Sequence, residues 1–132
     1  MQHLIEYTSL ILTALCLYRE TRGTSDEAQA AVATVILNRA GGKIDKLLDV
    51  ITKAGQFSSM TSPKNTQLVI WPKANDPEWH RCLAVVHAMA TGELSSIVGK
   101  ADHFHDTSVN PSWADPSKMV AAIQNLRFYQ LG

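Results

Sequence analysis

Glu20 is the residue of this sequence whose surroundings best suit acid catalysis. It stands between an apolar helical stretch at 10–17 and a second one at 28–40. A carboxyl group at such a junction is half sheltered by apolar walls and can still face a groove. A Glu in that setting keeps its proton near neutral pH and can act as a general acid. Taken alone the signal is weak, because most Glu side chains near helix ends are solvated.

Polar and aromatic side chains elsewhere in the chain could line a groove beside Glu20. Such mixtures bind sugar polymers, since aromatic faces stack on sugar rings while amides and hydroxyls bond their polar groups. Trp71 and Trp113 stand in proline-containing loops, where sugar stacking and packing are equally good readings, whereas Trp79 is expected in the core. The candidate groove residues are Arg22, Gln56, Phe57, Ser58, His103, His105 and Trp113.

His103 and His105 also raise the question of a metal site. Residues two apart in a strand point to the same face, so the two imidazoles could meet a zinc ion, with Asp102 or Asp106 as a further ligand. The sequence holds no H-E-x-x-H motif and no second His/Asp group at a convincing spacing. A groove-lining or packing role is therefore favoured, and neither a metal nor another cofactor is expected.

Composition indicates one globular domain, 1–132, with a core of its own. The chain has 132 residues, of which 45% are hydrophobic, with 12 basic and 12 acidic residues. A neutral balance argues against nucleic acid as the main partner. Cys16 and Cys82 each lie in an apolar helical pattern and are expected to be buried free thiols. The segment 10–17 is too short to span a bilayer, so no membrane insertion is expected.

Hydrophobic periodicity predicts a mainly α (α+β) fold with a small β element in the last third. In the first helix, Leu4, Tyr7, Ile11, Leu15 and Tyr18 form the expected core stripe. A capping box between Thr24 and Glu27 should start the second helix. The expected helices are 4–19, 28–40, 43–53 and one from Asp76 to before Gly92; 60–75 is expected to be loop, 97–99 and 101–105 extended, and 119–123 and 126–129 short strands or an irregular closing segment.

Seven blocks of the sequence, in this order, resemble the signature of the spore-cortex-lytic (SleB-type) cell wall hydrolases. They extend over nearly the whole chain, and the first block is the specific one. Thr24 departs from the family pattern, which often has a second Glu there, and Gln124 and Leu126 replace a common Gly and His. The blocks are 18–23, 27–33, 35–39, 56–58, 101–105, 110–113 and 123–129.

The resemblance implies a lysozyme-like, lytic-transglycosylase-like single domain that cleaves the β-1,4 bond between N-acetylmuramic acid and N-acetylglucosamine. It aligns Glu20 with the catalytic acid and adds Tyr129, in the last block, to the candidate groove residues. Glycosidases commonly use a second carboxylate. Glu27 and Asp102 are the candidates for that auxiliary role, but Glu27 has a capping role to fill and Asp102 is distant in sequence.

A lone acid favours a lytic transglycosylase, in which the substrate's own acetamido group assists and an anhydro product forms. The alternatives are a hydrolytic muramidase with the same acid, a zinc-dependent peptidoglycan peptidase or amidase using His103 and His105, and a non-catalytic glycan-binding module. The expected partners are peptidoglycan glycan strands.

The expected biological setting is that of a monomeric phage endolysin, held in the host cytoplasm until it is released to the cell wall or periplasm. No basic region precedes segment 10–17 and no small-residue cleavage site follows it, so no cleavable signal peptide is expected. An uncleaved export signal is the lesser alternative for that segment, and a bacterial prophage gene is an equally good source.

Overall fold

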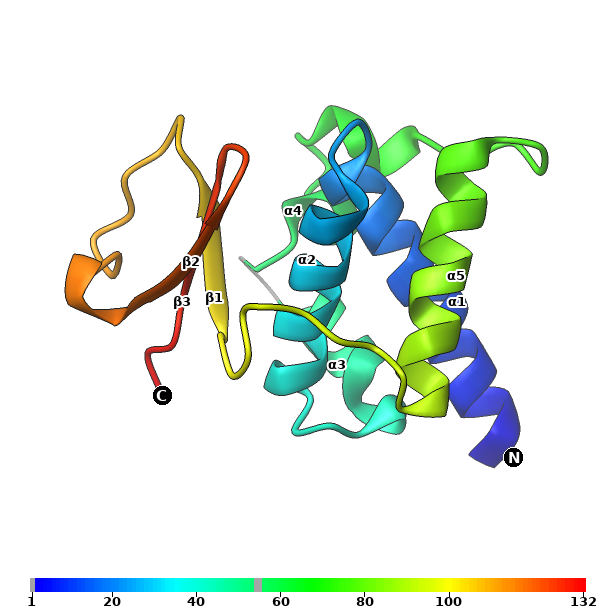
Figure 1. Cartoon of the computed structure of the whole chain (residues 1–132). Coiled ribbons are helices and arrows are strands. Elements are labelled where there is room, and N and C mark those ends of the chain that lie inside the picture. The colour runs from blue at the N-terminus through cyan, green and yellow to red at the C-terminus, as the bar shows by residue number, and fades with distance from the viewer. Residues whose placement is uncertain (1, 54–55) are drawn as a thin grey trace.

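The structure, a computed structural model, describes residues 2–53 and 56–132 and sets a helical layer beside a small antiparallel sheet (Figure 1). The long helices in the described part are α1 (Gln2–Thr21), α2 (Asp26–Arg39) and α5 (Pro77–Thr91). They confirm the helices predicted at 4–19, at 28–40 and after Asp76. The predicted fold class, mainly α with a small β element in the last third, is confirmed as well.

The shorter predicted elements are less accurate. The expected helix at 43–53 is two pieces, a 3-10 helix at Ile44–Lys46 and α3 (Leu47–Ile51). The expected loop at 60–75 contains the end of α4 (Ser58–Thr61) and a 3-10 helix at Thr66–Val69, and the stretch 97–99 is a turn rather than extended. Helices of four or five residues are marginal alone, so tertiary packing decides where they form.

The predicted capping box at the start of α2 is wrong by one residue. Ser25, not Thr24, is the N-cap, and its hydroxyl accepts a hydrogen bond from the amide of Ala28. The Thr24 hydroxyl instead donates to the carbonyl of Thr21 at 2.6 Å, which satisfies the end of α1. Glu27 is exposed in the first turn of α2, so the capping role expected for it falls away.

The sheet has the order β1-β3-β2, with β1 (His103–Asp106), β2 (Met119–Ile123) and β3 (Leu126–Tyr129) antiparallel to their neighbours. Of the two alternatives left open for 119–123 and 126–129, short strands are confirmed and an irregular closing segment is wrong. Gln124, in the turn between β2 and β3, has a φ of 50°, a left-handed conformation in which glycine is unstrained. Its side-chain oxygen accepts a hydrogen bond from the amide of Ser25 at 3.1 Å. This hydrogen bond links the β2–β3 hairpin to the start of α2 and offsets the conformational cost of the left-handed backbone at Gln124.

Aromatic packing joins the sheet to the helices. Phe104 of β1 stacks on Phe128 of β3 at 5.9 Å between ring centroids and reaches Phe57, just before α4, at 6.3 Å. Phe57 and Phe128 are fully buried in the same core as α1, α2 and α3. Cys16 and Cys82 are buried free thiols, as predicted.

The core stripe predicted along α1 is right only in its second half. Leu15 and Tyr18 are buried, but Leu4, Tyr7 and Ile11 are 63%, 67% and 50% exposed. Hydrophobic periodicity predicts which face of a helix is apolar. Burial of that face also requires another element packed against it, and no described element covers it in the first turns of α1. Within residues 2–53 and 56–132, no helix combines the length and the apolar character that crossing a membrane requires.

Exchange of the α2 cap tests this local structure. Ser25→Ala should lower the free energy of unfolding by about 1 kcal/mol, because the amide of Ala28 loses its partner. Glu27→Ala should change it by less than about 0.5 kcal/mol, since the Glu27 side chain is exposed. Urea denaturation of both variants measures the difference. If Glu27→Ala lowered the free energy of unfolding as much as Ser25→Ala, the predicted capping role of Glu27 would be right after all.

Candidate active site

Glu20 lies in the last turn of α1, just before the helix ends at Thr21. Its side chain is half-buried, and burial raises its pKa above the ordinary value of 4.5, while the hydroxyl of Ser59 pulls it down by less. Burial also raises the pKa of the Cys16 thiol one turn earlier, and the charge of Glu20 adds to that shift. The carboxyl therefore has the sheltered environment that the sequence predicts.

Ser59, which faces Glu20 from α4, is a site residue that the sequence analysis did not single out. It is 1% exposed, and its hydroxyl has no hydrogen-bond partner at normal geometry among the described residues. A buried hydroxyl left without a partner is costly, so a group that completes its bonding at this position is favoured. The neighbouring carboxyl of Glu20 and a bound polar substrate are both suited to do so.

Arg19 holds in place the segments that pack around Glu20. This buried guanidinium donates to the carbonyl of Ser59 and to the carbonyl of Ile70, both at 3.0 Å, and lies 5.0 Å from the ring centre of Trp71. Both α4 and the segment after it are therefore anchored on α1 next to the acid. Sequence reasoning missed this role because the partners are backbone atoms 40 and 51 residues away.

Arg22 lies on the exposed rim of the same helix end. Its guanidinium donates to the side chain of Gln67 at 2.8 Å and lies 4.9 Å from the ring centre of Tyr18. The Tyr18 hydroxyl donates to Asp76 at 2.5 Å, a bond that lowers the pKa of Asp76 and raises that of Tyr18. The predicted substrate-binding residue Arg22 is thus exposed close to Glu20 and held by its neighbours.

The block Gln56, Phe57 and Ser58 divides into exposed and buried residues. Phe57 is 1% exposed, so the prediction that it binds substrate is wrong: its ring has no free face. Gln56 is exposed and accepts a short hydrogen bond from Arg39. Ser58 is exposed and its hydroxyl accepts from Asn65 at 2.8 Å. Both polar residues remain available for substrate.

The candidate residues of the last third form one aromatic cluster. Trp113 packs on His103 at 5.0 Å, on His105 at 5.7 Å and on Tyr129 at 5.4 Å between ring centres. Since Phe104 turns toward Phe57, strand alternation places His103 and His105 on the other face of β1. Tyr129, predicted as a substrate-binding residue, is 3% exposed and has almost no free surface for a substrate.

No contact among the described residues joins this cluster to Glu20. The substrate-binding roles of His103, His105 and Trp113 therefore stay predictions. Trp79 packs partly buried against the ring of Tyr18, as expected of a core residue, whereas Trp71 is 69% exposed. Trp71 keeps most of its surface free beside Arg19 and is the better-placed aromatic for a sugar ring.

Hydrogen bonds occupy both ring nitrogens of His105. Its Nε2 pairs with the Tyr129 hydroxyl and its Nδ1 with the carbonyl of Asp106, each at 2.8 Å. A neutral imidazole that donates from Nδ1 accepts at Nε2, which leaves no lone pair for a metal ion. Within residues 2–53 and 56–132, no group of three His, Cys, Asp or Glu side chains could hold a metal.

Neither candidate for a second carboxylate is placed beside Glu20. Glu27 borders a hollow formed with segment 95–97. Asp102 accepts hydrogen bonds from the amides of Leu131 and Gly132 and pairs with His103. Burial pushes the pKa of Asp102 up, but these bonds outweigh it and the net pKa is lowered. Asp102 holds the C-terminal end against β1, so the auxiliary roles expected for both residues lose their structural basis.

Comparison with known proteins agrees with this geometry. The family model described as Cell Wall Hydrolase matches residues 23–129, most of the chain. The chain belongs to the cell wall hydrolase family. It is accordingly an enzyme that degrades cell wall peptidoglycan, and the SleB-type resemblance seen in the sequence is confirmed. None of the curated proteins matches the chain significantly.

A solved structure shares the fold of this cell wall hydrolase. It is the catalytic domain of the germination-specific lytic transglycosylase SleB from Bacillus anthracis, with a TM-score of 0.69 and 21% identity over 92% of this chain and 93% of that one. Glu20 lies three residues before the stretch that the family model matches. Its assignment therefore depends on its burial and its neighbours in the structure.

The raised pKa of Glu20 predicts how stability depends on pH. Between the ordinary value of 4.5 and the raised value, the folded state binds more protons than the unfolded state, so burial of this carboxyl costs stability as pH rises. The stability of Glu20→Gln relative to the parent should therefore increase from about pH 4 to about pH 7. Urea unfolding at several pH values measures it, and a difference independent of pH would show that the Glu20 pKa is not raised.

Proposed function

We propose that this cell wall hydrolase is a lytic transglycosylase that cleaves the β-1,4 bond between N-acetylmuramic acid and N-acetylglucosamine, with Glu20 as its one acid and base. The observation that carries the proposal is the isolation of Glu20. Burial and the Ser59 hydroxyl are the causes of its pKa shift, and no second carboxylate among the described residues contributes to it. The similar solved structure is the catalytic domain of a lytic transglycosylase, which supports the same reaction.

The first step uses the protonated form of Glu20. The carboxyl donates its proton to the glycosidic oxygen as the bond from that oxygen to C1 of the muramic sugar breaks, and the N-acetylglucosamine side leaves as an alcohol. The positive charge that develops at C1 is stabilised by the oxygen of the sugar's own C2 acetamido group. That assistance replaces the second carboxylate of a conventional glycosidase.

The second step uses the carboxylate that the first step leaves. Glu20 accepts the proton of the muramic C6 hydroxyl, and O6 bonds to C1 and displaces the acetamido oxygen. Glu20 is protonated again, and the product is a 1,6-anhydromuramic end formed without water. A carboxyl with a pKa raised toward neutrality suits both directions of proton transfer.

Hydrolysis is the nearest alternative, because water in place of the C6 hydroxyl would give a muramidase with the same acid. A non-catalytic glycan-binding module is disfavoured, since a half-buried acid with a raised pKa has no purpose in simple binding. A zinc peptidase that uses His105 is disfavoured by the bonds at both of its ring nitrogens.

Mass spectrometry of the muropeptides released from purified peptidoglycan tests the proposal. The parent enzyme should release products lighter by one water than the hydrolysis products, and Glu20→Gln should lower the rate of release at least about 100-fold. A chelator should leave the parent rate unchanged. Reducing ends in place of anhydro ends would establish hydrolysis.

Two matched variants separate a lone acid from a carboxylate pair. Glu93→Gln removes an exposed carboxyl after α5 and should keep the parent rate. Glu27→Gln tests directly the auxiliary role that the sequence predicts for the carboxyl near the start of α2. A loss in Glu27→Gln comparable to that in Glu20→Gln would show a two-carboxylate mechanism, and an unimpaired Glu20→Gln would remove Glu20 from the reaction.

A further inference from the structure

A basic hollow of about 490 Å³ lies between the C-terminal end of α2 and segment 43–53. Of the described residues that line it, four are cationic, Arg39, Lys43, Lys46 and Lys53, and one is a carboxylate, Asp49. The whole chain has 12 basic and 12 acidic residues, so composition does not explain this local excess. We call this feature the basic hollow.

The lysines of the basic hollow lack carboxylate partners. None of the ion pairs formed within the described residues includes Lys43, Lys46 or Lys53, and all three side chains are exposed. Like charges gathered within a Debye length of one another repel. An anionic ligand would relieve that repulsion, and the hollow provides the space for one.

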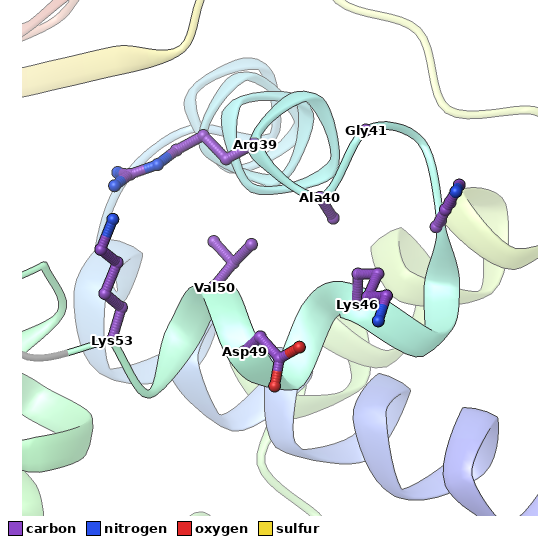
Figure 2. A pocket seen from close by; sticks show the side chains of 8 residues that line it. Arg39, Ala40, Gly41, Lys46, Asp49, Val50 and Lys53 are labelled. Atoms are coloured by element: carbon purple, nitrogen blue, oxygen red, sulfur yellow. The ribbon is translucent and has the colours of Figure 1, made fainter.

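The floor of the basic hollow is mainly apolar, and Asp49 is the one acidic residue among the described residues that line the hollow. Figure 2 shows Val50 and Ala40 directed into it, with Arg39 and Lys53 toward one end and Lys46 toward the other. Cationic groups at both ends of a small apolar floor suit a ligand that carries separate anionic groups with small apolar groups between them. A single compact anion would meet only one end.

Arg39 links the basic hollow to the active site. Its guanidinium donates to Gln56 and lies 5.9 Å from the ring centre of Phe57. From Gln56, three residues lead to Ser59, which faces Glu20, so the Cα atoms of Gln56 and Ser59 are at most about 11 Å apart. Burial lowers the pKa of Arg39, and the charge of Asp102 before β1 opposes that shift, which also places Arg39 toward the sheet.

We propose that the basic hollow binds the carboxylate groups of peptidoglycan stem peptides while the glycan strand lies at Glu20. Stem peptides carry both alanine methyl groups and free carboxylates, including the one at their end, which suits a lining with apolar side chains between cations. A five-residue peptide reaches up to about 17 Å when extended, and this is the length of chain with which a stem peptide on a muramic sugar near Glu20 could extend toward Arg39. The inference rests on the proposed function, and names the part of the substrate that this enzyme holds beside the scissile bond.

A binding experiment in the Glu20→Gln background isolates recognition from cleavage. Lys43→Gln, Lys46→Gln and Lys53→Gln are combined, and Arg39 is kept because it packs on Phe57. Binding to purified peptidoglycan freed of teichoic acids is measured by co-sedimentation. The triple variant should bind about tenfold more weakly than its parent, and added salt should reduce the difference. A variant with Lys73, Lys100 and Lys118 changed to Gln loses the same charge outside the hollow and should bind like the parent.

Two further substrates identify the anionic group. On glycan strands whose stem peptides have been removed by an amidase, the triple variant should bind as well as the parent. Peptidoglycan whose peptide carboxylates have been converted to amides should likewise abolish the difference. The proposal is wrong if the defect persists on peptide-free strands, if it appears only on walls that retain teichoic acid phosphates, or if the control variant is equally impaired.

The same substitutions in the active enzyme distinguish this inference from the proposed function. The triple variant should raise the apparent KM on peptide-bearing substrate about tenfold, with kcat and the type of product end unchanged. Loss of kcat instead would overturn the binding role. The nature of the product end tests the reaction at Glu20, and the peptide dependence of KM tests the basic hollow, so either can fail while the other stands.

Discussion

The buried guanidinium of Arg19 is the contact on which the active site depends. It takes no carboxylate partner among the described residues and instead bonds two backbone carbonyls, Ser59 and Ile70, from segments that are distant in sequence. Burial of an unpaired cation is expensive, and the pKa of Arg19 is lowered by that burial. The hydrogen bonds that the guanidinium donates offset part of this cost, and they hold α4 against the last turn of α1. Ser59 is thereby brought to face Glu20, and Glu20 acquires the sheltered wall that raises its pKa.

A second constraint is the aromatic core that joins the sheet to the helices. A three-stranded sheet of this size needs a packed face to be stable. Phe104 and Phe128 supply that face and meet Phe57, whose backbone leads into α4. The residue that secures the sheet therefore also begins the segment that carries Ser59. Removal of a buried Phe side chain typically costs about 3 to 5 kcal/mol, a large part of the total stability of many domains. Phe57 thus helps to position the segment beside Glu20, although it presents no surface to a substrate.

Local patterns in the sequence were enough to find the long helices, the strands at 119–123 and 126–129, the buried thiols and the setting of Glu20. These local patterns do not predict which residues distant in sequence contact one another, nor do they choose between neighbouring residues of similar type. Ser25 caps α2 in place of Thr24, and adjacent hydroxyl residues offer no local basis for choosing between them. Leu4 and Tyr7 fit a core stripe, yet burial requires an opposing element that periodicity does not reveal. Arg19 and Ser59 were missed because their roles arise from contacts across 40 residues. The endolysin setting and the monomeric state stay predictions.

The isolation of Glu20 and the charge of the basic hollow have a common physical meaning. An enzyme with one acid and no nucleophilic carboxylate relies on the substrate for part of the chemistry, because the acetamido group and the C6 hydroxyl must be aligned with C1. Binding energy at parts of the substrate that do not react holds the substrate in place, and where it is equal in the ground state and the transition state it lowers KM without changing kcat. The Ser59 hydroxyl, which faces Glu20, is buried. The cations of the basic hollow lie on a surface that Arg39 and Gln56 connect to the segment leading into α4, and they would supply binding energy of that kind. Arg19 and Arg22 flank Glu20 in the sequence, yet burial and the Ser59 hydroxyl are the causes of its pKa shift, so the raised pKa that suits both proton transfers comes from the sheltered position of the carboxyl.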